Sequence, residues 1–483
     1  MKGLITCFLF ALLLSSCSTP SLSPWHTVSL ESDFTASKER QFQSLDDYLQ
    51  LEDVLFSELA EKINKEVATG GDHAMSRYSD GSMSDPLIRQ PNWNRTFELE
   101  PETVRGGVLM LHGLTDSPYT FRSLAQSLVD SGYHVVGLRL PGHGTAPSGL
   151  NSLKWQDAAA AIRVALRHLG DAVDDKPIHL FGYSFGAPLA VNGALDAMEQ
   201  DDLPDPESIV LLSPAIGVTG AARFAGFVDS VLSIPGLRAR RWNRVIPEFD
   251  PYKYNSFTFN AGSQVHKLTR HVARRIEKRR KQNPENVLPP TLVFGSTVDA
   301  TVSIQSLVDR LLSMVSVGDV SVGKHEFVLF DINRVTATSE LLISNPGPFT
   351  ARTMARSDLP FTLSLVTNTQ PDSLEVEVRR KPPNTASVVE VTPLNLAWPE
   401  GVFSLSHLAL PIPTDDPLYG QVKPENRSDL FLGNSNFVGE TGMLVFPASW
   451  LMRLRYNPFY TYVEKRALGW ITTIDTVDRL VPN

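Results

Sequence analysis

Two kinds of apolar pattern alternate along the middle of the chain. Continuous apolar runs, each about as long as a buried strand, occur at residues 108–111, 135–138, 178–181 and 209–212. Apolar residues that recur with the period of an α-helix fill the segments 121–128, 158–169 and 186–198. Strands that alternate with helices predict an α/β fold, in which helices cover both faces of a mostly parallel sheet.

The alternation is interrupted twice. The first interruption, 217–290, is rich in aromatic and basic residues. It contains a helical stripe formed by Val265, Leu268, Val272 and Ile276. The strand and helix patterns return at 291–294, 304–311 and 327–330. The second interruption, 337–399, has runs of alternating polarity, which predict an inserted β-rich unit.

The first 16 residues read as a secretory signal. Lys2 supplies a positive charge, and residues 4–14 are almost continuously apolar but too short to span a bilayer. The run ends in Leu-Ser-Ser-Cys at 14–17, which resembles the lipobox of bacterial lipoproteins. This resemblance implies cleavage before Cys17 and its acylation, palmitate included, so that lipid holds the protein at the membrane. An ordinary signal peptide that contains a cysteine is the alternative.

Composition limits the partners of the chain. Its net charge of −9 over 483 residues argues against a nucleic-acid binder, which would show a basic field. The two cysteines are Cys7, within the signal, and Cys17, so the mature chain has no pair for a disulfide. By resemblance to enterobacterial lipoproteins, Ser18 favours the outer membrane of the cell envelope. The pattern does not indicate an oligomeric state.

The sequence Gly-Tyr-Ser-Phe-Gly at 182–186 fits the motif G-x-S-x-G and lies between a strand and a helix pattern. In this context the serine occupies a tight turn that lifts its hydroxyl out of the sheet, and glycines on either side avoid a clash. The start of the helix places amide N–H groups near a developing negative charge. Ser184 is therefore the candidate nucleophile. A glycine turn without chemistry is the alternative.

Two further motifs end strand patterns. His-Gly-Leu-Thr-Asp-Ser-Pro occupies 112–118, and Pro-Gly-His-Gly occupies 141–144. Together with 182–186, they resemble bacterial carboxylesterases and monoacylglycerol lipases of the α/β-hydrolase superfamily, over 103–216 and again over 291–332. The resemblance implies an α/β-hydrolase fold and an oxyanion hole formed by the backbone amides of Leu114 and Phe185. It makes His112 and His143 structural loop residues, and it puts 217–290 at the position of the cap in monoacylglycerol lipases.

A serine nucleophile needs a base, and the base needs a carboxylate that holds it. In α/β hydrolases the acid and then the histidine follow the serine along the chain. Residues 295–302 resemble the Gly-x-x-Asp-x-x-Val segment of the family, with Ser296 at a family glycine, which makes Asp299 the candidate acid. Asp331, one strand later, is the reserve, and a helix-capping role is the alternative for Asp299.

Two histidines, His325 and His407, follow Asp299. His325 precedes the strand pattern 327–330, which puts it at the opposite edge of the sheet. Related enzymes carry the base directly after this strand, where this chain has no histidine. We therefore expect the β-rich insertion to separate the strand from its histidine and assign the base to His407. A surface histidine is the alternative.

These patterns divide the chain into eight segments. They are a lipoprotein signal peptide (1–16), a flexible tether (17–41), an N-terminal helix with lead-in strands (42–102), the first part of the hydrolase core (103–216), a cap or lid (217–290), the second part of the core (291–336), the β-rich insertion (337–399), and a catalytic-histidine loop with a C-terminal helix (400–483).

The expected activity is hydrolysis of a small-molecule or lipid ester through Ser184, His407 and Asp299, with no cofactor or metal. Apolar cap residues are candidates for an acyl pocket, or for the core of the cap itself: Phe224, Phe227, Val228, Val231, Leu232, Ile234 and Leu237. The same fold hosts acyltransferases and peptidases, which remain alternatives. An inactive envelope lipoprotein that serves as a binding scaffold is a further alternative.

Overall fold

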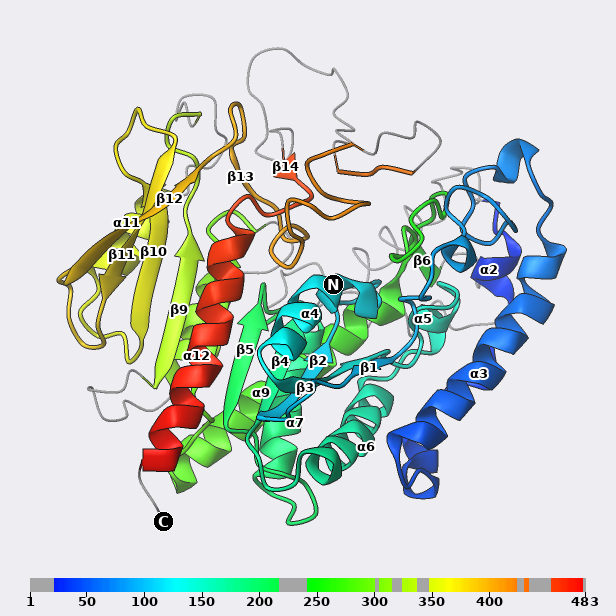
Figure 1. The fold of residues 1–483 in the computed structure, drawn as a ribbon, viewed down its shortest axis with the longest axis horizontal. Coiled ribbons are helices and arrows are strands. Elements are labelled where there is room, and N and C mark those ends of the chain that lie inside the picture. Colours follow the sequence, from blue (N-terminus) through cyan, green and yellow to red (C-terminus); the bar gives the residue numbers. More distant parts are fainter. Residues whose placement is uncertain are drawn as a thin grey trace, which may run out of the picture.

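A computed structural model describes residues 21–216, 241–299, 304–314, 324–336, 347–423, 430–433 and 453–480. Its central feature is a ten-stranded sheet with the order β1-β3-β2-β4-β5-β8-β9-β10-β11-β12 (Figure 1). The strands are β1 (Phe97–Leu99), β2 (Gly106–Leu111), β3 (Tyr133–Leu138), β4 (Ile178–Tyr183), β5 (Ser208–Leu212), β8 (Thr291–Ser296), β9 (His325–Phe330), β10 (Thr362–Asn368), β11 (Glu375–Lys381) and β12 (Glu390–Ala397). The strands from β3 to β10 run parallel, while β1, β11 and β12 pair antiparallel with their neighbours.

Helices cover both faces of this sheet. The α-helices of the described residues are α2 (Pro24–Thr27), α3 (Leu45–Lys62), α4 (Arg122–Asp130), α5 (Gly149–Ser152), α6 (Trp155–Val173), α7 (Gly186–Ala197), α9 (Phe259–Gln282), α10 (Ile304–Arg310), α11 (Gly347–Ala355) and α12 (Tyr460–Leu480). Two short sheets pair β6 (Trp242–Arg244) with β7 (Phe257–Thr258), and β13 (Ser404–Leu405) with β14 (Arg453–Leu454). None of the described helices combines the length and apolar character needed to cross a membrane.

The side chains of each central strand alternate between two hydrophobic cores. On β2, Leu109 and Leu111 join one core with residues of α6, α7, α9 and α10, while Val108 and Met110 join the other with α4 and α12. Successive residues of a strand point to opposite faces, so a strand buried on both sides is apolar throughout. The structure thus confirms the α/β fold that the continuous apolar runs predicted.

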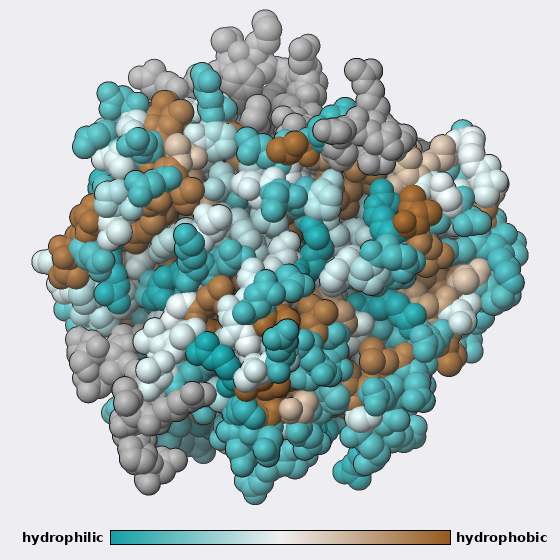
Figure 2. Space-filling view, viewed as in Figure 1, coloured by the Kyte–Doolittle hydropathy of each residue, from teal (hydrophilic) through white to brown (hydrophobic). Residues whose placement is uncertain are grey.

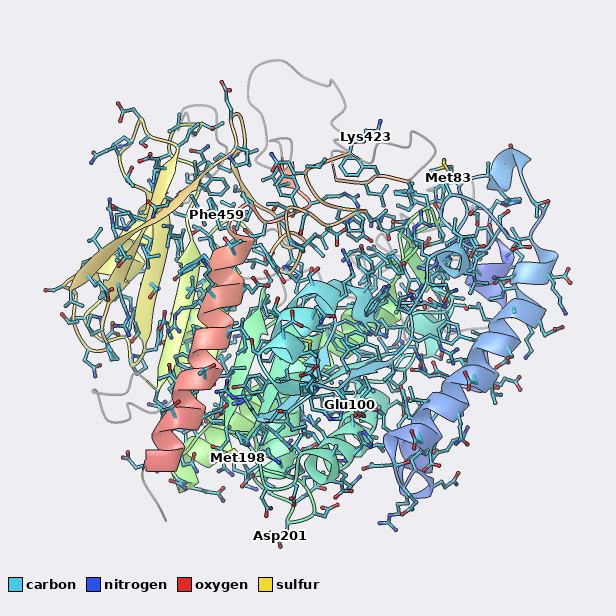
Figure 3. The ribbon with its side chains drawn as sticks, viewed as in Figure 1. Met83, Glu100, Met198, Asp201, Lys423 and Phe459 are labelled. Atoms are coloured by element: carbon cyan, nitrogen blue, oxygen red, sulfur yellow. The ribbon has the colours of Figure 1, made fainter. Side chains whose placement is uncertain are left out.

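The β-rich segment extends the central sheet and is not a separate unit. Strand β10 continues the parallel ladder, with Leu365 opposite Leu329 of β9, and β11 and β12 complete the edge as antiparallel strands. Hydrophobic residues gather over these outer strands at the left of Figure 2. Phe459, labelled in Figure 3, fixes the start of α12 to this extension, because its ring stacks on Phe330 and meets Trp398 edge-on.

The described part of the predicted cap also belongs to the core. Helix α9 carries the expected stripe, and its residues Val265, Leu268, Val272 and Ile276 lie in the same core as α6 and α7. The helix therefore packs on α6 and α7 as part of the core, and the expectation that it belongs to a lid is wrong. Residues 217–240, with the candidate acyl-pocket residues, lie outside the described part.

The tether predicted at 17–41 is wrong from residue 21 onward. Trp25, His26 and Phe34 are buried, and the ring of Phe34 packs against Phe42 and Tyr48. Three buried aromatic or heteroaromatic side chains bind this segment to the rest of the fold despite its Ser, Thr and Pro content. Residues 1–20, which include Cys17, lie outside the described part.

Truncation of Phe34 tests whether this segment contributes to folding. Phe34→Ala removes a side chain that is 1% exposed, and we expect it to lower the free energy of unfolding by about 3 kcal/mol. Val54→Ala on α3, where Val54 is 57% exposed, is the matched control and should change it by less than about 0.5 kcal/mol. Urea denaturation measures both. Equal stability of the two variants would mean that the N-terminal segment is not part of the cooperative fold.

Candidate active site

Ser184 occupies a tight turn between β4 and α7. Its backbone φ of 52° is left-handed, which is rare for a residue with a side chain, and its N–H donates to the carbonyl of Leu212. A Cβ at Gly182 would lie 2.5 Å from Cα of Ala187, and one at Gly186 would clash with the carbonyl of Leu111. Only glycines fit at both positions, which is the physical reason for the G-x-S-x-G spacing.

The structure brings Ser184, His407 and Asp299 together. His407 Nε2 lies 2.9 Å from Ser184 Oγ, and His407 Nδ1 lies 2.7 Å from Asp299 Oδ2. Asp299 follows β8 and Ser184 follows β4, at the carboxyl ends of parallel strands, and the Asp299 side chain is fully buried. With the proton on Nδ1 directed at the carboxylate, Nε2 keeps a lone pair that faces the serine hydroxyl.

His407 lies next to Ser184 because hydrogen bonds connect its loop to the ends of the strands β8 and β9. Asn333, just after β9, donates from its backbone N–H to the carbonyl of Phe403 at 2.8 Å and from its side-chain amide to the carbonyl of Val402 at 2.7 Å. The hydroxyl of Ser296 donates to the carbonyl of Leu405 at 3.1 Å. A histidine about 75 residues after β9 therefore returns to the end of that strand.

The proposed oxyanion amides lie at the expected loops. Phe185 begins α7, and Leu114 follows β2 in a loop in which Thr115 has a φ of 68°. Neither amide donates a hydrogen bond to another residue of the described part of the chain. Free N–H groups at a helix start and a strained loop are suited to hold a negatively charged oxygen.

His112 and His143 support these loops from beneath. His112 Nδ1 donates to the carbonyl of Gly113 at 2.9 Å, and its Nε2 accepts from the N–H of Leu140 at 3.1 Å. Burial holds the pKa of His112 well below its usual value and lowers that of His143 to about 4. Both rings are therefore neutral at pH 7, and their hydrogen bonds hold the loops in place.

The structure also adds residues that the motifs did not indicate. The Lys253 ammonium forms a buried ion pair with Asp116 of the oxyanion loop, and the N–H of Tyr254 donates to the carbonyl of Thr115 at 2.7 Å. Burial raises the pKa of Asp116, while Lys253 opposes that shift. The hydroxyl of Tyr183 donates to the carbonyl of His407 at 3.3 Å. Tyr183 could have been suspected, because it stands next to the candidate nucleophile Ser184 in sequence. No motif in the sequence points to Lys253.

The competing candidates lie elsewhere. The Asp331 carboxylate pairs with Arg334 at 2.6 Å and accepts from the hydroxyl of Thr367 at 2.9 Å, which commits it to β10. His325 is the first residue of β9, at the opposite end of the strands from Ser184, and neither of its ring nitrogens has a partner among the described residues. Neither side chain contacts Ser184.

Comparisons with known proteins agree with this fold. A sequence model described as the alpha/beta hydrolase family matches residues 108–334. A thermostable monoacylglycerol lipase of Bacillus sp. (strain H-257) is 29% identical over 132 residues, which are 26% of this chain and 50% of the lipase, so the chain spans half of that relative. Residues 108–334 therefore match the alpha/beta hydrolase family, in agreement with the observed fold, and part of the chain is similar to a monoacylglycerol lipase.

Solved structures of lipolytic enzymes are also similar. The metagenome-derived LipS and LipT enzymes match with 21% identity over 49% of this chain and 87% of theirs, at a TM-score of 0.39. The monoacylglycerol lipase of Paleococcus ferrophilus matches with 17% identity over 49% of this chain and 89% of its own, at a TM-score of 0.36.

Replacement of His325 tests its separation from the site. Burial lowers the pKa of His325 from its ordinary value of 6.5 to about 3. Between these two pH values His325 is protonated in the unfolded chain and neutral in the folded chain. Stability therefore falls as the pH drops from about 6.5 toward 3. In His325→Leu this loss should be smaller by about 1 kcal/mol per pH unit, with ester turnover unchanged. Urea denaturation from pH 7 to 4 and a turnover assay at pH 7 measure these effects, and lost turnover would make His325 part of the site.

Proposed function

We propose that the chain is a serine hydrolase that cleaves carboxylic esters with an acyl chain, through Ser184, His407 and Asp299. The observation that carries the proposal is the pair of hydrogen-bond distances, 2.9 and 2.7 Å, that link the three side chains in the order of a catalytic triad. The strained Ser184 backbone, the match to the alpha/beta hydrolase family and the similarity to a monoacylglycerol lipase support it.

The mechanism follows from this geometry. The Ser184 oxygen attacks the ester carbonyl carbon while its proton passes to His407 Nε2, and the Asp299 carboxylate stabilises the imidazolium that forms. The amides of Leu114 and Phe185 donate to the oxyanion of the tetrahedral intermediate. Its collapse breaks the C–O bond, and His407 returns the proton to the leaving alcohol. His407 then takes a proton from water as the water oxygen attacks the acyl carbonyl. The acyl–Oγ bond breaks, and His407 returns the proton to Ser184 Oγ, which releases the carboxylic acid and restores the serine.

We also propose that Cys17 carries a lipid and places the protein at the membrane of a bacterial cell envelope, with the outer membrane favoured by Ser18. The support is the apolar run that ends in Leu-Ser-Ser-Cys. A lipid ester is a suitable substrate for an enzyme held at such a surface.

Ser184→Ala tests the nucleophile. Without the hydroxyl no acyl-enzyme forms, and we expect kcat on p-nitrophenyl esters to fall about 10⁴-fold or more, with loss of fluorophosphonate labelling. Ser57→Ala on the exposed side of α3 is the control and should label like the wild type. If the folded wild type does not label, the inactive-scaffold alternative is favoured. A panel of p-nitrophenyl esters of increasing acyl length then defines the chain preference.

Asp299→Asn tests the acid against its competitor. An amide in place of the carboxylate favours the wrong histidine tautomer, so we expect kcat to fall about 10³- to 10⁴-fold with little change in folding. Asp331→Asn should keep its turnover although it loses the ion pair with Arg334. Steady-state kinetics and thermal melts separate activity from stability. The opposite ranking of the two variants would move the acid to Asp331.

Cys17→Ala tests the anchor. Expressed in a bacterial host with its signal, the wild type should incorporate an alkyne-labelled palmitate and enter the detergent phase of a Triton X-114 partition. Cys17→Ala should do neither, because acylation needs the thiol. Cys7→Ala, within the signal, is the matched control and should behave as the wild type. Labelling that persists in Cys17→Ala would contradict acylation at this residue.

A further inference from the structure

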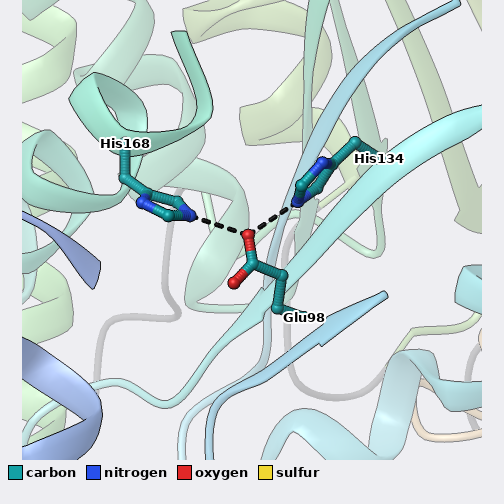
Figure 4. A group of neighbouring side chains, drawn as sticks. All are labelled: Glu98, His134 and His168. Atoms are coloured by element: carbon teal, nitrogen blue, oxygen red, sulfur yellow. Dashed lines mark hydrogen bonds and ion pairs between the residues drawn. The ribbon is translucent and has the colours of Figure 1, made fainter. Parts of the chain in front are cut away.

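Three potential metal ligands converge at the edge of the sheet, far apart in sequence (Figure 4). Glu98 comes from β1, His134 from β3 and His168 from α6. Nε2 of His134 and Nε2 of His168 both point at the same oxygen, Glu98 Oε1, at 2.6 and 2.7 Å. One ligand atom from each side chain lies within 4.8 Å of the others.

Rigid elements fix this convergence. Glu98 pairs with Val136 across the antiparallel β1–β3 ladder, so Glu98, Val136 and His134 point to one face of the sheet. Helix α6 packs on that face, as Leu166 and Leu169 share a core with Val136. His168, between these two leucines in sequence, reaches the edge where β1 ends the sheet. The positions of the three side chains are therefore set by strands and a helix, and not by loops.

The three side chains form ion pairs with one another, and their chemistry also suits a transition metal. Two imidazole nitrogens and one carboxylate oxygen form a ligand set that Zn²⁺ accepts, with ligand bonds of about 2.0–2.1 Å. Tetrahedral ligands at that distance lie about 3.3 Å apart, so each N···O contact would lengthen by roughly 0.6 Å as the metal replaces the shared protons. Both Glu98 and His168 side chains are 20% exposed, which leaves room for water as a fourth ligand.

We propose that Glu98, His134 and His168 form a binding site for a single Zn²⁺ ion that fastens β1 to β3 and α6. Strand β1 has three residues and lies at the edge of the sheet, paired on one side. A metal ion bound to residues of β1, β3 and α6 would hold this edge strand in place, because β1 is short and has a hydrogen-bonded neighbour on one side only. His134 is the second residue of β3, at the end of the parallel strands opposite Ser184, so the site is structural and independent of the proposed ester chemistry.

Metal titration of the full chain tests the site. The protein, purified without a histidine tag and stripped with EDTA, is titrated with Zn²⁺ by calorimetry, and its metal content is measured by elemental analysis. We expect one Zn²⁺ per chain and a rise in Tm of several degrees when Zn²⁺ is in about 100-fold excess over Kd. Co²⁺ in place of Zn²⁺ should give the visible bands of a four-coordinate site.

Single substitutions identify the ligands. Glu98→Gln and His168→Ala should each weaken Zn²⁺ binding about 100-fold or more, because loss of a ligand costs at least as much as loss of its supporting contacts. His271→Ala, at a ring that lies 4.8 Å from the Trp155 ring, is the control for adventitious histidine binding and should match the wild type. Binding that is absent from the wild type, or unchanged in both ligand variants, would overturn the proposal.

The proposed ester hydrolysis and the proposed Zn²⁺ binding can be tested independently of each other. Ser184→Ala should bind Zn²⁺ as the wild type does, and EDTA-stripped wild type should keep its ester turnover at a temperature well below its Tm. Loss of turnover in Ser184→Ala with metal binding intact would leave both proposals standing. Turnover that depends on Zn²⁺ at such a temperature would contradict a purely structural role for the metal.

Discussion

The two hydrogen bonds of Asn333 to the backbone at 402 and 403 are the contacts on which the candidate site depends. Ser184 and Asp299 are placed by their own strands, but His407 belongs to a loop that has left the sheet and returned. Asn333 is fully buried and uses both its side-chain amide and its backbone N–H for this purpose. These hydrogen bonds fix the position of the loop, because any shift of the loop would leave the buried amide of Asn333 without a hydrogen-bond partner.

A second polar centre supports the loops around the site. The guanidinium of Arg139 is fully buried and pairs with both Glu52 of α3 and Asp33 of the N-terminal segment, each at 2.9 Å. It also donates to the carbonyl of His143, and Asp33 accepts from the N–H of Gly142 at 2.6 Å. The N-terminal segment thus completes the environment of the loop at 141–144. Removal of Glu52 or Asp33 would leave the buried positive charge of Arg139 only partly compensated in an interior of low dielectric constant.

The sequence alone was sufficient where the determinants are local. Continuous apolar runs predicted the central strands, and the glycine spacing around Ser184 and the strand before Asp299 located two of the site residues. His407 could be reached only by elimination, because the bonds from Asn333 and Ser296 that place it join residues about 70 and 110 positions apart. The prediction of a flexible tether at 17–41 was wrong from residue 21 onward for a similar reason. Its polar composition is typical of a flexible chain, but a few aromatic residues in it pack against distant parts of the fold. The convergence of Glu98, His134 and His168 has no motif at all, since each comes from a different element.

The buried position of Trp25 has a consequence for how an acylated protein would meet its substrate. Seven residues separate Cys17 from Trp25, a stretch of chain that spans no more than about 29 Å when fully extended. If Cys17 is acylated, this short linker would confine the protein to diffusion along the membrane, where it would meet molecules that share its leaflet. Esters dissolved in the surrounding fluid would gain nothing from this confinement, whereas those embedded in the bilayer would be encountered at a greatly increased local concentration.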